Sequence, residues 1–131
     1  MIKHKILSDI GLKEEQMMVN LCGDNDSRAK DWAEQRKEYG FDERETWSLD
    51  YAFVEWLLER LVMYKNVTIV DMSYHKFDFK GEVLTQEECI DRMIELCKKY
   101  IFTKDSWDAE LPKTWYELTE LWSICGQAMW W

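Results

Sequence analysis

The sequence has few of the residues from which metal centres and general bases are usually built. Only two histidines, His4 and His75, occur in 131 residues, whereas a zinc or non-haem iron site draws on several imidazole or thiolate ligands. The chain also has no Gly-rich phosphate loop, no GxSxG nucleophile elbow and no HExxH pair. These absences argue against the common catalytic classes, and we expect a protein without enzyme activity, metal or cofactor.

Long apolar runs are also missing. No stretch approaches the roughly 20 apolar residues that a membrane span requires, and the segment 1–8 lacks the apolar region and cleavage site of a signal peptide. With one proline, 47% apolar and 15% aromatic residues, the chain can still bury a core of its own. We therefore expect a soluble single domain over residues 1–131, with no membrane partner.

The four cysteines show no spacing typical of a zinc site or a redox motif. Cys22, Cys89, Cys97 and Cys125 form no CxxC pair, and three of them fall on apolar stripes of predicted helices. Buried free thiols fit that pattern better than a disulfide framework does, and free thiols are typical of a reducing compartment. The expected location is the cytoplasm.

The charge of the chain is one-sided. Counting 26 Asp and Glu against 17 Lys and Arg gives a formal net charge of -9 at pH 7. Such a chain repels phosphate backbones, so we expect no direct contact with nucleic acid and favour a partner that presents a basic surface. The alternative is that the acidic surface only keeps the protein in solution.

Hydrophobic periodicity and capping residues predict several helices in the first half of the chain. A short helix is expected over residues 12–22. A second helix should begin at Asp26 or Ser27, because their side chains can cap a helix N-terminus. It should end at Tyr39, with Gly40 supplying the left-handed residue that commonly follows a helix.

The third helix, over residues 48–65, is predicted to be the most apolar element. Two apolar rows cover most of its circumference and leave a thin polar strip near Glu55 and Glu59. A helix of this kind is typical of the centre of a bundle. The residues expected to face inward are Leu49, Phe53, Trp56, Leu57, Leu61 and Tyr64 in one row and Val54, Leu58 and Val62 in the other.

After the third helix the period changes from that of a helix to that of strands. Aromatic and charged residues alternate within 67–84, which predicts a small β-hairpin insert that turns at residues 80–81. Thr85 should then begin a fourth helix by forming a capping box with Glu88, and Pro112 suits the first turn of a fifth. The expected fold is mainly α (α+β), a compact bundle of about five helices around the third, central helix.

Paired carboxylates are the remaining candidates for acid–base or metal chemistry. Glu55 and Glu59 are four residues apart and so share one face of the central helix. A second pair would have to come from the later helices, which carry Glu88, Asp91, Glu95, Glu117 and Glu120. No histidine accompanies any of them, so solvated helix faces are the simpler interpretation.

Eight tryptophans in 131 residues are the anomaly of the composition. Four of them lie outside every predicted apolar stripe, namely Trp47, Trp107, Trp130 and Trp131. Large aromatic side chains rimmed by polar groups are typical anchors of protein interfaces. We predict a partner-binding surface made of Asp42, Glu43, Glu45, Trp47 and Asp50, near a helix N-terminus that favours negative charge. The alternative is that these residues only cap and stabilise that helix.

Part of the chain resembles a known group of proteins. The run YGFDERETWSLD at residues 39–50 is followed by an amphipathic helix that ends LVMYK at 61–65, and the run IDRMIE stands at 90–95. This pattern, over roughly residues 39–101, resembles small uncharacterised phage and prophage proteins. The resemblance implies the cytoplasm of a bacterial host cell and a protein that binds host proteins, as inhibitors of bacterial defence such as anti-CRISPR proteins do.

Three functions follow from these features. The first is a non-enzymatic, acidic protein-binding module that occupies a basic, nucleic-acid-binding surface of a host or defence protein. The second is a small structural or assembly protein that forms a homodimer or larger homo-oligomer through exposed tryptophans. The third is a metal enzyme built on the helix carboxylates.

Overall fold

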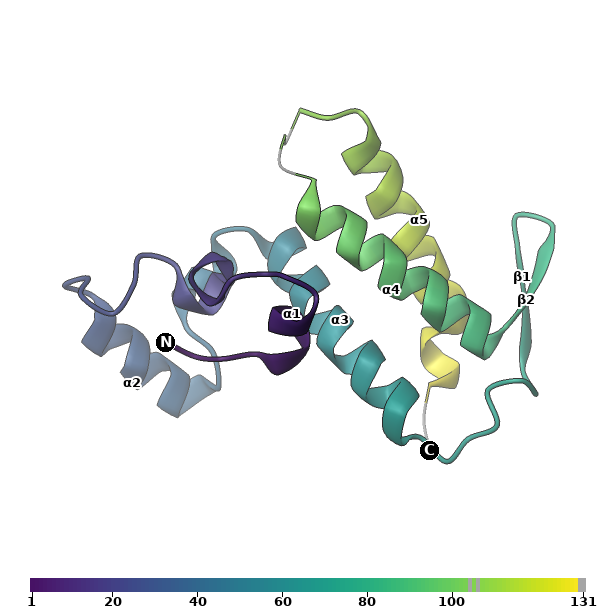
Figure 1. The fold of residues 1–131 in the computed structure, drawn as a ribbon, viewed down its shortest axis with the longest axis horizontal. Helices are drawn as coiled ribbons and strands as arrows, with labels where there is room; N and C mark the ends of the chain where they lie inside the picture. The colour runs from purple at the N-terminus through teal and green to yellow at the C-terminus, as the bar shows by residue number, and fades with distance from the viewer. Residues whose placement is uncertain (104, 106, 130–131) are drawn as a thin grey trace. The chain divides into compact units, whose positions relative to one another are not determined.

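The structure is a computed structural model that describes residues 1–103, 105 and 107–129. Within these residues the chain forms five α-helices, four short 3-10 helices and one two-stranded antiparallel sheet, which confirms a mainly α fold with a small hairpin. The chain divides into two compact units, Met1–Trp56 and Leu57–Trp131, and helix α3 (Leu49–Val67) begins in the first and ends in the second (Figure 1). A single domain over residues 1–131 stays a prediction.

The beginning of the first unit differs from the sequence-based prediction. Helix α1 (Lys5–Asp9) was not expected, and the single helix expected over 12–22 is replaced by two 3-10 helices, η1 (Glu14–Gln16) and η2 (Met18–Asn20). The extended backbone of Met17, with ψ 142, separates the two turns. All four residues from 17 to 20 are buried, and an α-helix could not place four consecutive residues on one face.

Helix α2 (Ala29–Tyr39) buries very little apolar surface. Trp32 is the one fully buried side chain of its 11 residues. The helix ends at Gly40, whose φ of 85 confirms the predicted left-handed residue. At the other end the side chain of Asp26 accepts a hydrogen bond from the Arg28 backbone, and the helix proper begins at Ala29. A helix with so few buried residues needs specific polar contacts to hold it in place.

Helix α3 is longer than predicted at its C-terminal end, and its buried face is rotated. The side chains that are almost fully buried are Val54, Leu57, Leu58 and Leu61. Leu49 and Trp56, which the sequence placed inward, are 67% and 46% exposed, whereas Glu55 of the expected polar strip is buried. Because nearly the whole circumference is apolar, periodicity alone could not select the face.

The hairpin of the second unit is shorter than the segment predicted for it. Strands β1 (Lys76–Phe79) and β2 (Glu82–Thr85) pair in antiparallel register, with Phe77 opposite Leu84. The predicted turn is confirmed, since Lys80 and Gly81 have φ of 52 and 81, and two positive φ values in a two-residue loop match the twist of a hairpin. One face of the hairpin buries Phe79 and Leu84.

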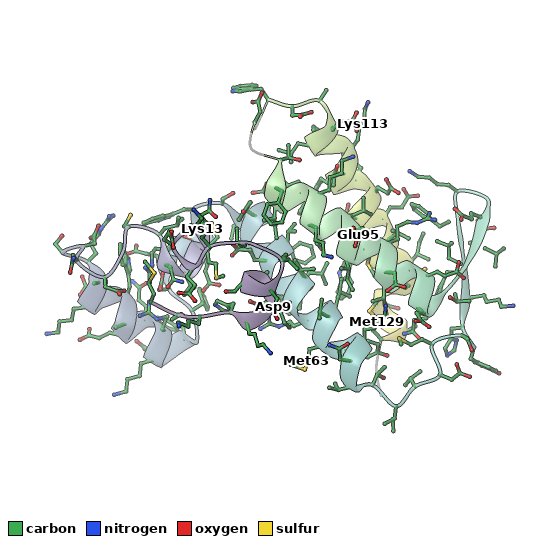
Figure 2. The ribbon with its side chains drawn as sticks, viewed as in Figure 1. Asp9, Lys13, Met63, Glu95, Lys113 and Met129 are labelled. Carbon is green, nitrogen blue, oxygen red and sulfur yellow. The ribbon has the colours of Figure 1, made fainter. Side chains whose placement is uncertain are left out.

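Helices α4 (Gln86–Phe102) and α5 (Glu110–Cys125) lie side by side in the second unit, followed by the 3-10 helix η4 (Gly126–Ala128) (Figure 1). The capping box predicted at the start of α4 is confirmed. The Thr85 hydroxyl accepts a hydrogen bond from the Glu88 amide at 3.2 Å, and the Glu88 carboxylate accepts one from the Thr85 amide at 3.1 Å. The outer faces carry exposed charges such as Glu95 and Lys113, labelled in Figure 2.

None of the helices in the described part of the chain is both long enough and apolar enough to cross a membrane.

Candidate functional site

Asp42, the first residue of the predicted partner-binding surface, is buried. It caps the 3-10 helix η3 (Glu43–Thr46), and only 1% of the residue is exposed. Its Oδ1 accepts hydrogen bonds from the backbone and the Nε of Arg44, both at 2.9 Å, and its Oδ2 accepts one from Arg44 Nη2 at 2.7 Å. Arg36 of α2 donates a further bond to Oδ2. The prediction that Asp42 lies at the surface was therefore wrong. The residue is buried because the guanidinium groups of Arg44 and Arg36 bind its carboxylate.

The electrostatics of Asp42 agree with this geometry. Burial raises the pKa of the carboxyl group, but the hydrogen bonds from Arg44 and Arg36 outweigh that effect, so the pKa lies below its ordinary value. Arg44 is itself only 4% exposed and donates a further hydrogen bond to the carbonyl of Leu21 at 3.1 Å. The pair thus keeps its charges inside the fold, where hydrogen bonds replace the lost water.

Trp32 of α2 is the centre of the same cluster. The guanidinium carbon atoms of Arg28 and Arg44 lie over its ring, 4.8 and 4.3 Å from the ring centre. Trp47 meets Trp32 edge-on, with the two rings 5.8 Å apart, an arrangement that aromatic pairs favour. We call Arg28, Trp32, Asp42, Arg44 and Trp47 the Trp32 cluster. It binds α2 to the segment that precedes α3.

Glu43 is exposed to solvent and also takes part in two hydrogen bonds within the fold. Its Oε1 accepts the indole N–H of Trp32 at 2.7 Å, while its backbone N–H donates to Oε1 of Gln35 at 2.8 Å. The side chain is nevertheless exposed to solvent. One oxygen is therefore committed to the fold, and the negative charge still reaches the surface.

The other three predicted residues differ in their exposure. Trp47 is 45% exposed although one edge packs on Trp32, and Asp50 is exposed and accepts a hydrogen bond from the Ser48 hydroxyl at 2.8 Å. Glu45 is only half-buried, and burial together with the negative charge of Asp42 raises the pKa of its carboxyl group. Of the five residues, Glu43, Trp47 and Asp50 are thus plainly at the surface.

Three further apolar residues of this part of the chain are exposed, and sequence reasoning missed them. Tyr39 and Phe41 are 62% and 48% exposed, with their rings 6.4 Å apart, and Leu49 is 67% exposed. Tyr39 and Phe41 flank Gly40, where a helix ends, and this was the one signal in the sequence that could have found them. Together with Trp47 they give the first unit exposed aromatic and aliphatic side chains near the carboxylates of Glu43 and Asp50 in the sequence.

The remaining tryptophans without a predicted stripe fall elsewhere. Trp107, between α4 and α5, is 92% exposed. Trp130 and Trp131 lie outside the described residues. Exposure of Trp107 agrees with its absence from any helical stripe.

Several of the helix carboxylates considered for metal or acid–base chemistry have other partners within the fold. Glu55 accepts a hydrogen bond from the Met18 amide at 3.3 Å. Glu88 belongs to the capping box, and ion pairs join Asp91 to Lys65 and Glu95 to Lys98. In the ranges that the structure describes, no three His, Cys, Asp or Glu side chains gather closely enough to hold a metal ion.

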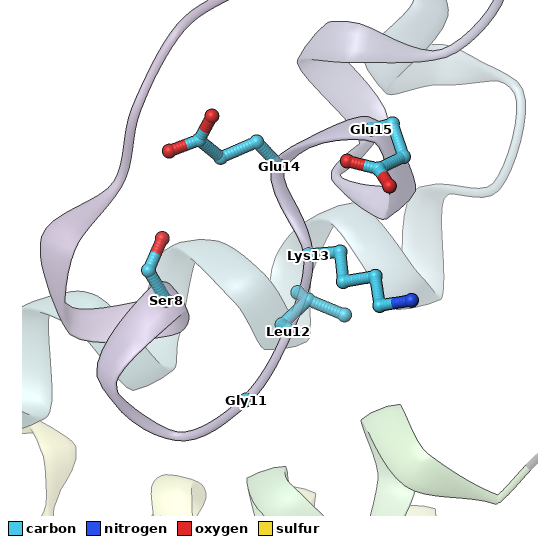
Figure 3. A pocket seen from close by; sticks show the side chains of 6 residues that line it. All are labelled: Ser8, Gly11, Leu12, Lys13, Glu14 and Glu15. Carbon is cyan, nitrogen blue, oxygen red and sulfur yellow. The ribbon is translucent and has the colours of Figure 1, made fainter.

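Two open pockets lie at the surface of the protein. One, of about 330 Å³, is lined by Ser8, Gly11, Leu12, Lys13, Glu14 and Glu15, and Figure 3 shows the Lys13 ammonium extending away from the Ser8 hydroxyl. The other, of about 300 Å³, lies at the end of α5 against Trp122 and Gly126.

No protein-family model, curated protein or solved structure matches the chain. The residues of the predicted surface that are exposed are Glu43, Trp47 and Asp50, with Glu45 half-buried beside them in the sequence.

Proposed function

We propose that the chain is a non-enzymatic, acidic module that binds a basic protein surface through Trp47, with Glu43, Glu45 and Asp50 as the charged surroundings. The observation that carries the proposal is the state of Trp47, which is 45% exposed although its ring is fixed against Trp32. Exposed tryptophans at the centre of a polar rim are the commonest strong anchors of protein interfaces.

The setting of Trp47 favours binding because the side chain loses little freedom when a partner covers it. The Trp32 ring contacts it edge-on, and the Arg28 guanidinium carbon lies 5.6 Å from its ring centre. Ordering a free side chain on binding costs about 0.5–1.5 kcal/mol, and a pre-ordered anchor avoids most of that cost.

The charges define the chemistry of the partner. Asp42 is neutralised inside the fold, so Glu43 and Asp50 supply the exposed charge, and the whole chain carries a net charge of -9. A basic protein surface complements such a patch and is attracted to it over a distance. A basic patch or stripe is the electrostatic footprint of a nucleic-acid-binding site. The resemblance to small phage proteins supports a host or bacterial defence protein as the binding partner. The two proteins would then meet in the cytoplasm of a bacterial cell.

The test neutralises the two exposed carboxylates without disturbing the fold. Glu43→Gln and Asp50→Asn each keep an acceptor oxygen, for the Trp32 indole and the Ser48 hydroxyl respectively. The matched control, Glu34→Gln with Glu38→Gln, removes the same charge from exposed positions of α2 in the same unit. The wild-type protein, the double variant and the control would each be immobilised. Each would be used to capture nucleic-acid-binding proteins from a bacterial lysate over a range of salt concentrations.

We expect capture by the wild type and the control to fall steeply with salt and to be displaced by added DNA, while the double variant captures little at any salt concentration. Equal melting temperatures of the three proteins would show that the fold is intact. Capture by the Glu43→Gln/Asp50→Asn protein that equals wild type, or resists DNA, would contradict the proposal.

A homo-oligomer is the second candidate, and the 92% exposure of Trp107 is the observation that favours it. Light scattering at increasing concentration would detect such an assembly, and Trp107→Ala should return it to the monomer. The carboxylate metal enzyme has no supporting arrangement in the part of the chain that the structure describes.

A further inference from the structure

The small sheet of the second unit has two outer edges. Among the residues that the structure describes, strands β1 and β2 pair only with each other (Figure 1). In an antiparallel pair, every second residue directs its backbone N–H and C=O groups toward the neighbouring strand. Phe77 is paired with Leu84, and two positions further along the ladder the Gln86 amide donates a hydrogen bond to the His75 carbonyl at 3.1 Å. The odd-numbered residues of β1 therefore face β2, and the even-numbered residues face outward.

The outward-facing residues of β1 are Lys76 and Asp78. Their backbone groups make no hydrogen bond with the described residues outside the hairpin. Both side chains are exposed, and because they are two positions apart they lie on the same face of the strand. Lys76 forms no ion pair within the described part of the chain, and the Asp78 carboxylate accepts only the Gly81 amide, at 3.1 Å. The edge of β1 thus presents free backbone groups and one un-neutralised charge of each sign.

This order of charges is complementary to itself. If two β1 strands pair in antiparallel about a two-fold axis through Phe77, Lys76 stands opposite Asp78 of the partner subunit, and the reverse pair forms as well. The outward-facing backbone groups of these residues then make the hydrogen bonds between the strands, and the two Phe77 residues stand opposite each other between them. Opposite charges and aromatic side chains directly across from each other both stabilise a sheet.

Other registers and the other edge lack this complementarity. An axis through Asp78 sets two aspartates opposite each other and Lys76 opposite Lys80 of the partner subunit, and an axis through Lys76 sets two lysines opposite each other. Like charges in these positions destabilise a sheet. On β2 the outward-facing residues are Val83 and Thr85, and the Thr85 amide is occupied by the capping box. The charges therefore select one edge and one register.

We propose that β1 is a dimerisation edge, at which a second copy of the chain extends the hairpin to a sheet of four strands, with Lys76 and Asp78 paired across the two-fold axis. A strand of four residues gives a small interface, so the dimer is weak and forms at high protein concentration. Every residue of this interface lies in the second unit, so the dimer does not depend on the partner proposed for Trp47.

Sedimentation equilibrium at protein concentrations up to about 1 mM tests this edge, since that range detects even a weak association. Lys76→Glu sets like charges opposite each other twice and should weaken dimerisation by about tenfold or more. The matched control is Lys37→Glu, which makes the same charge change at an exposed position of α2 and should dimerise as wild type does. A wild type that stays monomeric over the whole range, or equal dimerisation by Lys76→Glu, would overturn the proposal.

A charge exchange tests the register. Lys76→Glu has two negative charges at the edge and Asp78→Lys has two positive charges, so each variant alone should be monomeric. In a mixture of the two, every carboxylate faces a lysine of the other variant, and a heterodimer should form. A mixture of two folded variants that stays monomeric would contradict the register. Because Asp78→Lys also loses the hydrogen bond to the Gly81 amide, it could fail to fold, and the comparison of wild type, Lys37→Glu and Lys76→Glu then decides the proposal.

Two further measurements locate the contact. Hydrogen exchange of the Lys76 and Asp78 amides should slow as the concentration of wild type rises, while the Val83 amide on the opposite edge should exchange at an unchanged rate. Trp107→Ala should dimerise as wild type does, because Trp107 lies outside the hairpin. A dimer that is lost in Trp107→Ala and kept in Lys76→Glu would overturn the proposal in favour of assembly through Trp107.

Discussion

Arg44 binds Asp42 through two parallel hydrogen bonds, from Nε to Oδ1 at 2.9 Å and from Nη2 to Oδ2 at 2.7 Å. Both residues are buried, and Arg36 of α2 adds a third charged donor. A carboxylate held in this way is unavailable to a partner, but it fixes the segment that presents Trp47. The acidic cluster seen in the sequence therefore divides into an internal residue that builds the surface and outer residues that form it.

Asp42→Asn should destabilise the protein by about 3 kcal/mol, because it leaves the buried Arg44 guanidinium without its counter-ion. Urea denaturation followed by circular dichroism would measure the change. Asp50→Asn is the matched control, since Asp50 is exposed and surface substitutions usually change stability by less than about 0.5 kcal/mol. Equal effects of the two substitutions would contradict the internal role of Asp42.

The same pair predicts a dependence of stability on pH. The pKa of Asp42 is lower in the folded protein than its ordinary value of 3.8, because the hydrogen bonds from Arg44 and Arg36 outweigh burial. A depressed folded pKa contributes stability that is present above the unfolded pKa and is lost as pH falls through the folded pKa. The difference in unfolding free energy between wild type and Asp42→Asn should be constant above about pH 5 and shrink below about pH 4. Urea titrations across that range would check it, and a difference that stays constant at acid pH would exclude this origin.

Local signals in the sequence were sufficient for several elements. The capping box of Thr85 and Glu88 and the turn at Lys80 and Gly81 depend on residues within three positions of each other, so their geometry could be predicted without knowing the rest of the fold. Gly40 was found for the same reason.

The predictions that failed depend on tertiary contacts that local sequence signals do not reveal. Glu55 was expected on a polar strip, but it accepts the Met18 amide from 37 positions away. Asp42 was expected at the surface, and its partner Arg44 is only two positions away, but its burial also involves Arg36 of α2, whose approach to the carboxylate no local signal reveals. An acidic run before a helix is equally consistent with an exposed patch and with a buried cap, and only tertiary contacts separate the two.

Thr85→Ala should destabilise the second unit by about 1 kcal/mol through loss of the bond from the Glu88 amide. Thr85→Ser is the matched control because it keeps the hydroxyl oxygen and removes only a methyl group. Thermal unfolding of the two variants would be compared with that of wild type. If Ser lowered the melting temperature as much as Ala did, the contribution would come from the methyl group and the capping bond would not be its source.

Trp47 and Trp56 offer a matched pair for testing which exposed tryptophan anchors a partner. They are 45% and 46% exposed, and both belong to the first unit. Trp47 precedes α3 and is fixed against Trp32 near Glu43, whereas Trp56 stacks on Phe53 within α3. Replacing either by alanine removes a similar exposed area, so a general loss of surface hydrophobicity would affect capture equally in both variants.

If Trp47 is the anchor, Trp47→Ala should weaken capture of the partner by at least about tenfold, since truncation of an interface tryptophan typically costs 2 kcal/mol or more. Trp56→Ala should leave capture close to that of wild type. The measurement is the dissociation constant for one purified captured protein, with the melting temperature of each variant as the check on folding. Because Trp47→Ala also removes the edge contact on Trp32, a modest fall in the melting temperature of this variant is expected. Trp47→Phe keeps an aromatic edge, so its stability should return closer to that of wild type than its affinity does. A loss of affinity in Trp56→Ala that equalled the loss in Trp47→Ala would move the anchor away from the Trp32 cluster and end the proposal in its present form.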